Sequence, residues 1–253
     1  MFDFKDKIIL ITGAASGIGR SSAESLANKG AIIIANYHNR ASDANNLLYK
    51  LKNKNQQSCI EQADVSNYKE VSGLLQKVNN TYGRLDGLVN CSGIVEFQSL
   101  GSFEILNIDQ QIKVNLLGTI YVTKESISLL RKSNCPSVVN ISSLATKIGQ
   151  ADISPYAASK GGVVSFSKSC AVEFAPHIRF NIISPGIIDT GIELNNLNFD
   201  QIENNRKKLM DRIPLKRRGK SQDVVNLIEF LLSEKSSYIT GQDIFIDGGW
   251  SIS

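Results

Sequence analysis

Short apolar runs alternate with longer stretches of helical periodicity along the chain. The apolar runs are rich in β-branched residues and fall at 7–12, 31–36, 58–64, 86–91, 136–142, 178–184 and 243–247. The stretches between them repeat apolar residues at helical spacing, at 17–30, 41–54, 67–82, 108–132, 154–175 and 222–233. Such alternation is typical of right-handed βαβ units. The pattern predicts an α/β fold with a doubly wound, seven-stranded parallel sheet and helices on both faces.

The strand–helix rhythm continues through the 253 residues without a linker rich in Pro, Gly or Ser. It therefore predicts a single domain over residues 1–253. Residues 187–214 are the exception, since a long irregular segment after a strand is often an active-site lid. We expect residues 191–213 to cover a substrate. Their apolar side chains suit an apolar or amphipathic substrate, or a lid helix that buries its own apolar face: Ile192, Leu194, Leu197, Phe199, Leu209 and Met210.

Composition narrows the class of protein. The chain is 42% hydrophobic and 21% charged with a net charge of +4, which does not favour nucleic-acid binding. Its densest basic stretches, 206–208 and 216–220, are either solvated loops or an attraction for an anionic substrate or carrier. The start of the chain lacks the features of a signal peptide, and no run approaches the ~20 apolar residues of a membrane span.

Cysteine and histidine usage argues against a metal site. The four cysteines show no CxxC spacing, and two histidines cannot build a zinc site with them. We expect a reduced, cytoplasmic protein with no metal, no membrane and no nucleic-acid partner.

A glycine-rich turn follows the first predicted strand. Residues 12–19 read TGAASGIG, with glycines spaced G-x-x-x-G-x-G before an amphipathic helix. Glycine lets the backbone approach a phosphate closely, and a helix N-terminus offers free N–H groups. The placement predicts nucleotide binding through Gly13, Ser16, Gly17, Ile18 and Gly19.

The second strand ends without a carboxylate. Ribose 2′-hydroxyl recognition often uses an Asp or Glu here, but residues 36–40 are Asn-Tyr-His-Asn-Arg and the first carboxylate is Asp43. A 2′-phosphate would meet no repulsion beside Tyr37, and His38 or Arg40 could pair with it. This favours NADP(H) over NAD(H). The alternative is that the His38 and Arg40 side chains merely face water.

Later strand ends carry further candidates. Asp64 could accept from an adenine amino group or cap the next helix, with Val65 beside it. Small residues at 90–93 would leave room for a ribose and supply Asn90, Ser92 and Gly93; we expect Cys91 there to pack rather than act as a nucleophile. The stretch 184–190 would turn beneath a nicotinamide and supply Pro185, Gly186, Ile188 and Thr190.

Tyr156 and Lys160 stand four residues apart in a predicted helix and would share one face. Together with the motifs above, they make the sequence resemble the short-chain dehydrogenase/reductase family, from about residue 5 to residue 250. The resemblance rests on 12–19, 64–65, 90–93, Asn115, Ser143, YAASK at 156–160, 181–190 and 238–249. It departs in one turn, where the family's Asn-Asn-Ala-Gly is Asn-Cys-Ser-Gly.

The resemblance implies a Rossmann sheet, an NAD(P) cofactor and hydride transfer between nicotinamide and a carbonyl or alcohol. It implies a homotetramer in which the helices at 108–132 and 154–175 pair across subunits. Tyr156 would be the general acid, with its pKa lowered by Lys160, which would also bind the nicotinamide ribose. Ser143 would orient the substrate oxygen, and Asn115 would hold a water that links the lysine to solvent.

The substrate is less defined. The sequence is similar to the 3-oxoacyl-acyl-carrier-protein reductase branch, which implies a small-molecule or carrier-bound carbonyl, and also to sugar and alcohol dehydrogenases. Arg131 and Lys132 could help to dock an acidic carrier, or simply complement the helix dipole. A non-catalytic NADP(H) sensor on the same fold is the alternative from another class, although the complete Asn115, Ser143, Tyr156 and Lys160 set argues against it.

Overall fold

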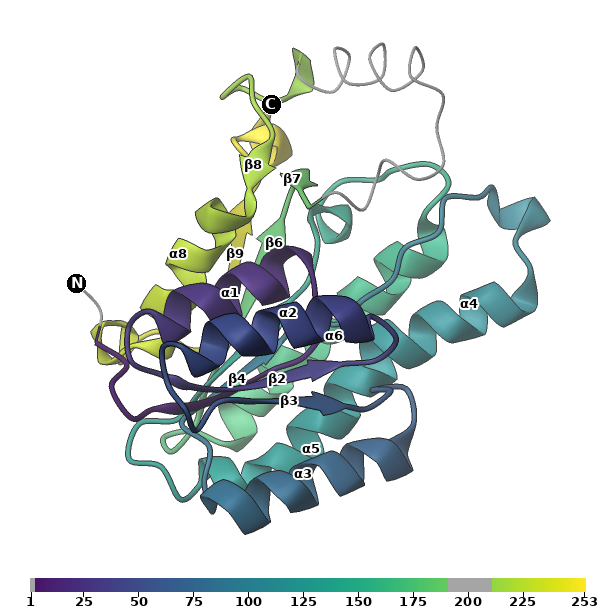
Figure 1. Cartoon of the computed structure of the whole chain (residues 1–253). Helices are drawn as coiled ribbons and strands as arrows, with labels where there is room; N and C mark the ends of the chain where they lie inside the picture. The colour runs from purple at the N-terminus through teal and green to yellow at the C-terminus, as the bar shows by residue number, and fades with distance from the viewer. Residues whose placement is uncertain (1–2, 191–210) are drawn as a thin grey trace.

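We describe the protein from a computed structural model, which defines residues 3–190 and 211–253. Its centre is a seven-stranded sheet in the order β3-β2-β1-β4-β5-β6-β9, with every neighbouring pair parallel (Figure 1). The strands are β1 (Ile8–Ile11), β2 (Ile32–Tyr37), β3 (Cys59–Gln62), β4 (Gly87–Asn90), β5 (Ser137–Ile141), β6 (Arg179–Pro185) and β9 (Asp243–Ile246). The chain order reverses between β1 and β4, the place where doubly wound sheets bind dinucleotides.

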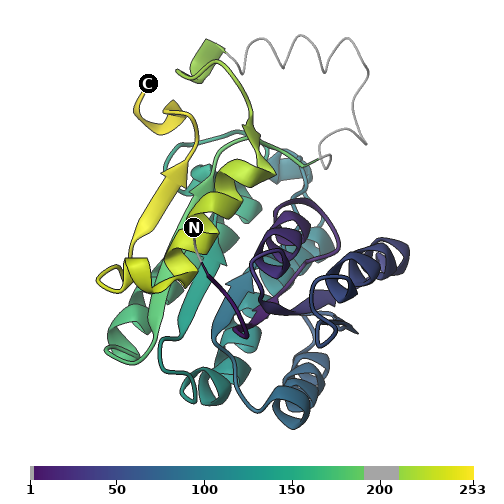
Figure 2. The same cartoon turned by 60° about the vertical axis from the view of Figure 1, so that its left-hand side comes forward.

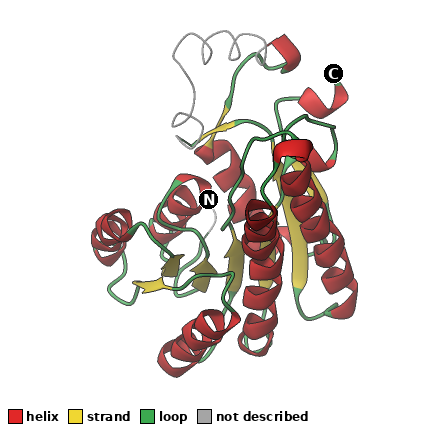
Figure 3. Cartoon of the chain, turned by 90° about the vertical axis from the view of Figure 1, so that its right-hand side faces the viewer, coloured by secondary structure: helices red, strands yellow, loops and turns green. Residues whose placement is uncertain are grey.

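Helices cover both faces of this sheet, as Figures 2 and 3 show. One face is covered by α1 (Gly17–Ala27), α2 (Ala41–Lys52) and α8 (Ser221–Leu232). The other is covered by α3 (Tyr68–Tyr82), α5 (Gly118–Leu130) and α6 (Ser154–Glu173), with α4 (Ile105–Ile112) packed against α6. Short 3₁₀ turns complete the chain: η1 (Leu100–Ser102), η3 (Leu144–Thr146), η5 (Glu234–Ser236) and η6 (Trp250–Ile252).

The two apolar cores explain why the strands are apolar throughout. Ile9 and Ile11 of β1 point into the core under α1, α2 and α8, whereas Ile8 and Leu10 point into the core under α3 and α5. Because both faces of a parallel sheet are covered, alternate residues are all buried and no polar face remains. The predicted fold class is confirmed.

The predicted boundaries hold to within a few residues, with instructive differences. The strand expected at 58–64 keeps only Cys59–Gln62. The helix expected at 108–132 starts earlier, at Ile105, and contains a π-turn, η2 (Lys113–Leu117), between α4 and α5. Periodicity did not predict this turn, because the segments on both sides of it are helical and the sequence reads as one helix.

A second, two-stranded parallel pair joins β7 (Ile188–Asp189) to β8 (Gly219–Lys220) above the main sheet (Figure 1). Sequence patterning missed it because two-residue strands carry no periodicity. Most of the lid predicted at 191–213 lies outside the described residues. Of its last residues, Ile213 is buried with Leu144 and Trp250. Within the described part of the chain, no helix has the length and apolar character needed to span a membrane.

Candidate active site

The glycine turn after β1 has the geometry of a phosphate-binding turn. Gly13 and Gly17 have φ angles of +63° and +55°, a region that L side chains rarely adopt. A Cβ on Gly19 would lie 2.5 Å from the carbonyl oxygen of Gly13, so the helix could not start so close to the strand with any side chain there. The turn leads into the N-terminus of α1, whose N–H groups suit an anion.

Hydrogen bonds join this turn to the one after β4. The Thr12 hydroxyl oxygen accepts from the backbone N–H groups of Cys91 at 3.0 Å and Ser92 at 3.1 Å. A Cβ on Gly17 would lie 3.4 Å from the Thr190 side chain. The structure therefore brings together the predicted cofactor residues after β1, β4 and β7 around one space.

The end of β2 places polar side chains in solvent. The side chains of His38 and Arg40 are 58% and 52% exposed. His38 Nε2 lies 3.9 Å from Asp64 Oδ2, and Arg40 Nη1 lies 3.9 Å from Asp43 Oδ2. Both contacts are long, so the His38 imidazole and the Arg40 guanidinium are available to a phosphate group.

Asp64 shapes the turn after β3. Its Oδ1 accepts from the Ser66 backbone N–H at 2.9 Å and from the Ser66 hydroxyl at 2.8 Å. The cap of α3 is Asn67, whose side chain accepts from the Lys69 N–H, so the alternative that Asp64 is the helix cap is wrong. Val65 beside it is buried in the core.

Asn90 points inward rather than into the site. It is 3% exposed, and its amide donates to Thr123 Oγ1 at 3.0 Å and to Asn140 Oδ1 at 2.8 Å. Any contact with a cofactor at this position is left to the backbone. Gly93, in contrast, faces the reacting groups, since a Cβ there would lie 3.3 Å from both Asn115 Oδ1 and Lys160 Nζ.

The residues after β6 combine packing with site formation. A Cβ on Gly186 would lie 2.9 Å from the Cα of Asp247, so glycine is required by that close approach. Pro185 is buried at the end of β6, and Ile188 is buried in the core beneath the site. Of the residues predicted here, Thr190 is the one that borders the glycine turn.

Lys160 is a buried cation. It is 4% exposed, and its ammonium donates to the Ile141 carbonyl oxygen at 2.9 Å. Burial lowers the pKa of this ammonium to about 8, with Cys91 opposing the shift. The group can thus lose or regain its proton near neutral pH.

Tyr156 lies one helical turn away, with the Lys160 ammonium 6.0 Å from the centroid of its ring. We predicted from the sequence that the lysine would lower the pKa of this phenol. The pKa is instead raised, because burial dominates and the hydrogen bond with Ser143 opposes it only in part. The phenol is therefore protonated at neutral pH, which is the form that donates a proton.

Asn115 sits in the π-turn and is fully buried. Its Oδ1 accepts from the Ile94 N–H at 2.8 Å, and its Nδ2 donates to the Ile94 carbonyl at 2.9 Å and to Ser159 Oγ at 3.0 Å. Both amide hydrogens are thus used. A water that links Lys160 to solvent would have to bind the remaining lone pair of Oδ1 or the Asn115 carbonyl.

Sequence reasoning missed two residues that hold the site together. The Ser159 hydroxyl donates to the Tyr156 carbonyl at 2.7 Å and so links the π-turn to the first turn of α6. Thr12 ties two strand ends together as described above. Both lie inside motifs that were recognised, but a hydroxyl within a motif does not reveal which neighbour it bonds.

Cys91 has the packing role expected of it. Its side chain packs against the core under α1, and burial raises the pKa of its thiol to about 11. Among the described residues, no three His, Cys, Asp or Glu side chains gather as a metal site would require.

A dinucleotide-type turn, a buried lysine and a tyrosine bonded to a serine at one strand edge define an oxidoreductase. The chain matches the family described as enoyl-(acyl carrier protein) reductase over residues 13–251. It belongs to the short-chain dehydrogenase/reductase family, whose members use a nicotinamide cofactor.

Curated relatives and solved structures agree with this assignment. The chain is 35% identical to 3-oxoacyl-[acyl-carrier-protein] reductase FabG of Thermotoga maritima, over 96% of this chain and 97% of the relative. FabG of Staphylococcus aureus strain Mu50 is 32% identical, over 96% and 97%.

Ligand-free aldohexose dehydrogenase (AldT) of Thermoplasma acidophilum superposes with a TM-score of 0.87 at 30% identity, covering 100% of this chain and 97% of that one. A putative short-chain alcohol dehydrogenase of Sinorhizobium meliloti 1021 gives a TM-score of 0.92 at 28% identity, covering 100% and 99%.

Proposed function

We propose that the protein reduces a ketone with NADPH and that Tyr156 donates the proton. The observation that carries this proposal is the Tyr156–Ser143 pair, a partly buried phenol whose pKa is raised by burial, beside a hydroxyl that can orient a carbonyl oxygen. A bound nicotinamide would supply the hydride. As negative charge develops on the substrate oxygen, Ser143 stabilises it and the Tyr156 hydroxyl transfers its proton there.

Lys160 has two tasks in this scheme. Its ammonium donates to the Ile141 carbonyl at the end of β5. Because Lys160 and Tyr156 lie on the same helix, α6, this ammonium is suited to bind the ribose next to the nicotinamide. It also stabilises the phenolate left after proton transfer. Asn115 positions this helix by bonding Ser159, which in turn bonds Tyr156.

The cofactor preference rests on the end of β2. The His38 imidazole and the Arg40 guanidinium are half-exposed and make only long contacts, and residues 36–40 hold no carboxylate to repel a 2′-phosphate. Arg40 is always charged, whereas His38 is charged only when protonated, so Arg40 is the stronger candidate for the phosphate.

For the substrate we propose a 3-oxoacyl thioester, supported by the sequence likeness to two FabG reductases. Arg131 and Lys132 follow α5 next to Ser133, whose hydroxyl bonds Asp86 at the amino end of β4. They therefore lie at the sheet edge opposite Tyr156. A carrier protein docked on Arg131 and Lys132 would lie far from Tyr156 of the same subunit. It could reach only the active site of another subunit, and we propose a homotetramer in which it does so.

A panel of substrates tests the proposed function. NADPH oxidation is measured with acetoacetyl groups on carrier protein and on coenzyme A and with simple ketones, and NADP reduction with aldohexoses and secondary alcohols. We expect the thioesters to give the highest kcat/KM and NADPH to exceed NADH. Faster oxidation of an aldohexose, to which the likeness to AldT points, or no turnover at all, would overturn the proposal. Arg131→Ala should slow only the carrier-bound substrate.

A further inference from the structure

Residues 93–98, which follow β4 and which we call the wall segment, border the active site. The segment begins at Gly93, where a Cβ would lie 3.3 Å from Lys160 Nζ. At its other end, the Gln98 backbone N–H donates to the Asp152 carbonyl at 2.8 Å, two residues before α6 begins. The wall segment thus runs from the buried lysine to the turn that leads into the helix of the phenol, so its position affects the space beside both groups.

Two side-chain amides on one helix hold the wall segment. Asn115, in η2, accepts from the Ile94 N–H at 2.8 Å and donates to the Ile94 carbonyl at 2.9 Å. Gln111 lies one turn earlier, on α4, and its Oε1 accepts from the Glu96 N–H at 3.3 Å. Residues four apart share a helix face. The two amides therefore bind alternate residues of the wall segment from the same side.

Gln111 is nonetheless a costly residue at this position. It is fully buried, and in the described part of the chain its Nε2 has no hydrogen-bond partner. The orientation of the amide is fixed, because a backbone N–H can only donate and must face the amide oxygen. A buried donor without an acceptor lowers stability, and an apolar side chain of similar size would avoid that cost. Stability alone therefore does not account for a glutamine here.

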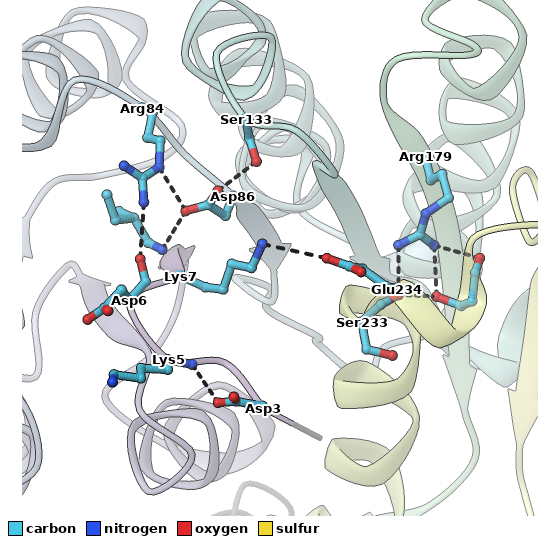
Figure 4. A network of polar contacts seen from close by, with 12 residues as sticks. Asp3, Lys5, Asp6, Lys7, Arg84, Asp86, Ser133, Arg179, Ser233 and Glu234 are labelled. Carbon is cyan, nitrogen blue, oxygen red and sulfur yellow. Dashed lines mark hydrogen bonds and ion pairs between the residues drawn. The ribbon is translucent and has the colours of Figure 1, made fainter. Parts of the chain in front are cut away.

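The Arg179 guanidinium shows how such a group looks when its role is in the fold. Its Nε also lacks a hydrogen-bond partner within the described residues. Its terminal nitrogens, however, donate to five oxygens of residues 231–239 and so bind the end of α8 and the turn after it (Figure 4). The Gln111 side chain makes a single hydrogen bond in the described structure, and that bond goes to the wall segment.

The far end of the wall segment carries a second costly feature. Asp152, whose carbonyl accepts from Gln98, has a φ angle of +65°. Residues other than glycine adopt this conformation at a cost, and such strain is concentrated at functional sites. The wall segment is therefore held at two points by residues that the fold alone does not favour.

We propose that Gln111 is a positioning residue for the reaction. Its Oε1 holds Glu96, and with it the wall segment, at the distance from Tyr156 that fits the ketone. The stability lost at Nε2 is tolerated for this reason. The proposal rests on the ketone reduction proposed above. Because Gln111 acts through the wall segment, Tyr156, Ser143 and Lys160 stay in place without it.

The test is the variant Gln111→Met, which keeps a similar side-chain volume and removes both the acceptor and the unpartnered donor. We expect KM for the ketone to rise about 10-fold, the upper end for one neutral hydrogen bond, with kcat within about 3-fold of wild type. The Kd of NADPH should be unchanged, and the midpoint of urea unfolding should not fall. An unchanged KM, with or without a lower midpoint, would show a purely structural role and overturn the proposal.

Two further variants complete this test. Gln111→Glu keeps an oxygen acceptor at the same length, and a carboxyl group buried here stays neutral, so KM should remain within about 3-fold of wild type. Gln110→Met, at the exposed neighbouring position of α4, is the matched control and should change no value. If Gln111→Glu raised KM as much as Gln111→Met, the acceptor would not be what positions the wall segment, and the proposal would fail.

Hydrogen–deuterium exchange followed by mass spectrometry separates this proposal from the proposed function, because it needs no substrate. Gln111→Met should speed exchange of the Glu96 N–H about 10-fold and leave that of the Ile94 N–H, which Asn115 holds, unchanged. Wild-type protein that turned over no substrate of the panel would refute the proposed function. Unchanged exchange at Glu96 in the variant would instead refute the role of Gln111.

Discussion

Polar groups at the two ends of the strands differ in how fully they are hydrogen-bonded. We call these ends the amino edge, where the parallel strands begin, and the carboxyl edge, where they finish. At the amino edge, the Asp86 carboxylate accepts from the Ile8 N–H at 2.9 Å, from Arg84 Nε at 3.2 Å and from the Ser133 hydroxyl at 2.6 Å. At the carboxyl edge, within the described residues, the Lys160 ammonium makes one hydrogen bond and the Tyr156 hydroxyl bonds Ser143. An ammonium can donate three hydrogen bonds, so its capacity is largely unused.

This difference separates groups that hold the fold from groups that wait for a ligand. A saturated buried carboxylate contributes stability, because its partners would otherwise be left without hydrogen bonds. An under-bonded buried ammonium lowers stability, and it persists where function requires it. The contrast can be tested at four positions, taken from the largest expected effect to the smallest.

Tyr156→Phe, at the carboxyl edge, should lower turnover without disturbing the fold. Only the proton donor is removed, so kcat should fall at least ~10²-fold while cofactor binding is kept, as for other general acids. Steady-state turnover and cofactor fluorescence titration measure the two effects. Tyr121→Phe, on α5, is the control and should keep normal kcat. Near-normal turnover of Tyr156→Phe would remove this residue from the mechanism.

Asp86→Ala should have the opposite effect: it should lower the stability of the fold and leave turnover unchanged. It leaves the buried Ile8 N–H and the Ser133 hydroxyl without their acceptor, which should lower the free energy of unfolding by about 3 kcal/mol. Urea unfolding measures this loss. Turnover per folded molecule should stay normal because the site is distant. Asp3→Ala, an exposed carboxylate nearby, should change stability by less than about 0.5 kcal/mol.

Lys160→Met should raise stability and abolish activity. The folded-state pKa of about 8 lies below the unfolded value of 10.5, so the folded protein carries the cost of charging Lys160 fully below pH 8. The variant should gain about 3 kcal/mol at pH 7, since each pKa unit corresponds to about 1.4 kcal/mol. The gain should shrink between pH 8 and 10.5, where wild-type stability rises because only the unfolded chain binds this proton. Urea unfolding at a series of pH values measures this gain in the free energy of unfolding, with Lys168→Met as the control. A gain that did not change with pH would contradict the prediction.

Arg40→Ala should have the smallest effect, confined to cofactor choice. Losing one exposed cation at the 2′-phosphate should lower kcat/KM for NADPH about 10-fold, the scale of a charge-assisted contact, and leave NADH unchanged. Lys54→Ala removes an exposed charge near the other end of α2 and should change neither value. A parallel loss with both cofactors would show that Arg40 supports the fold of this loop instead.

Strand and helix positions could be predicted because covered parallel strands are apolar on both faces and the helices between them are amphipathic. The glycine turn was equally visible, since positive φ angles at Gly13 and Gly17 need glycine and leave a mark in the sequence. The roles of Asn90 and Asp64 were not visible in the same way. Their motifs placed them near the site. Only the fold shows that the Asn90 amide donates inward to Asn140 and that the Asp64 carboxylate accepts hydrogen bonds from Ser66.

Electrostatics was the least predictable property. The spacing of Tyr156 and Lys160 placed both groups on one helix face correctly. It could not show that burial raises the pKa of the phenol, because burial depends on segments that are distant in the sequence.

The π-turn η2 makes this part of the chain sensitive to length as well as to identity. Removing one residue between 113 and 117 would let α4 and α5 merge into a regular helix, since the surplus residue is what the wider turn accommodates. Everything on one side of the deletion would then rotate by about 100° relative to the other. Asn115 would lose its reach to Ile94. This part of the chain should therefore tolerate a substitution at an exposed position better than the loss or gain of a single residue.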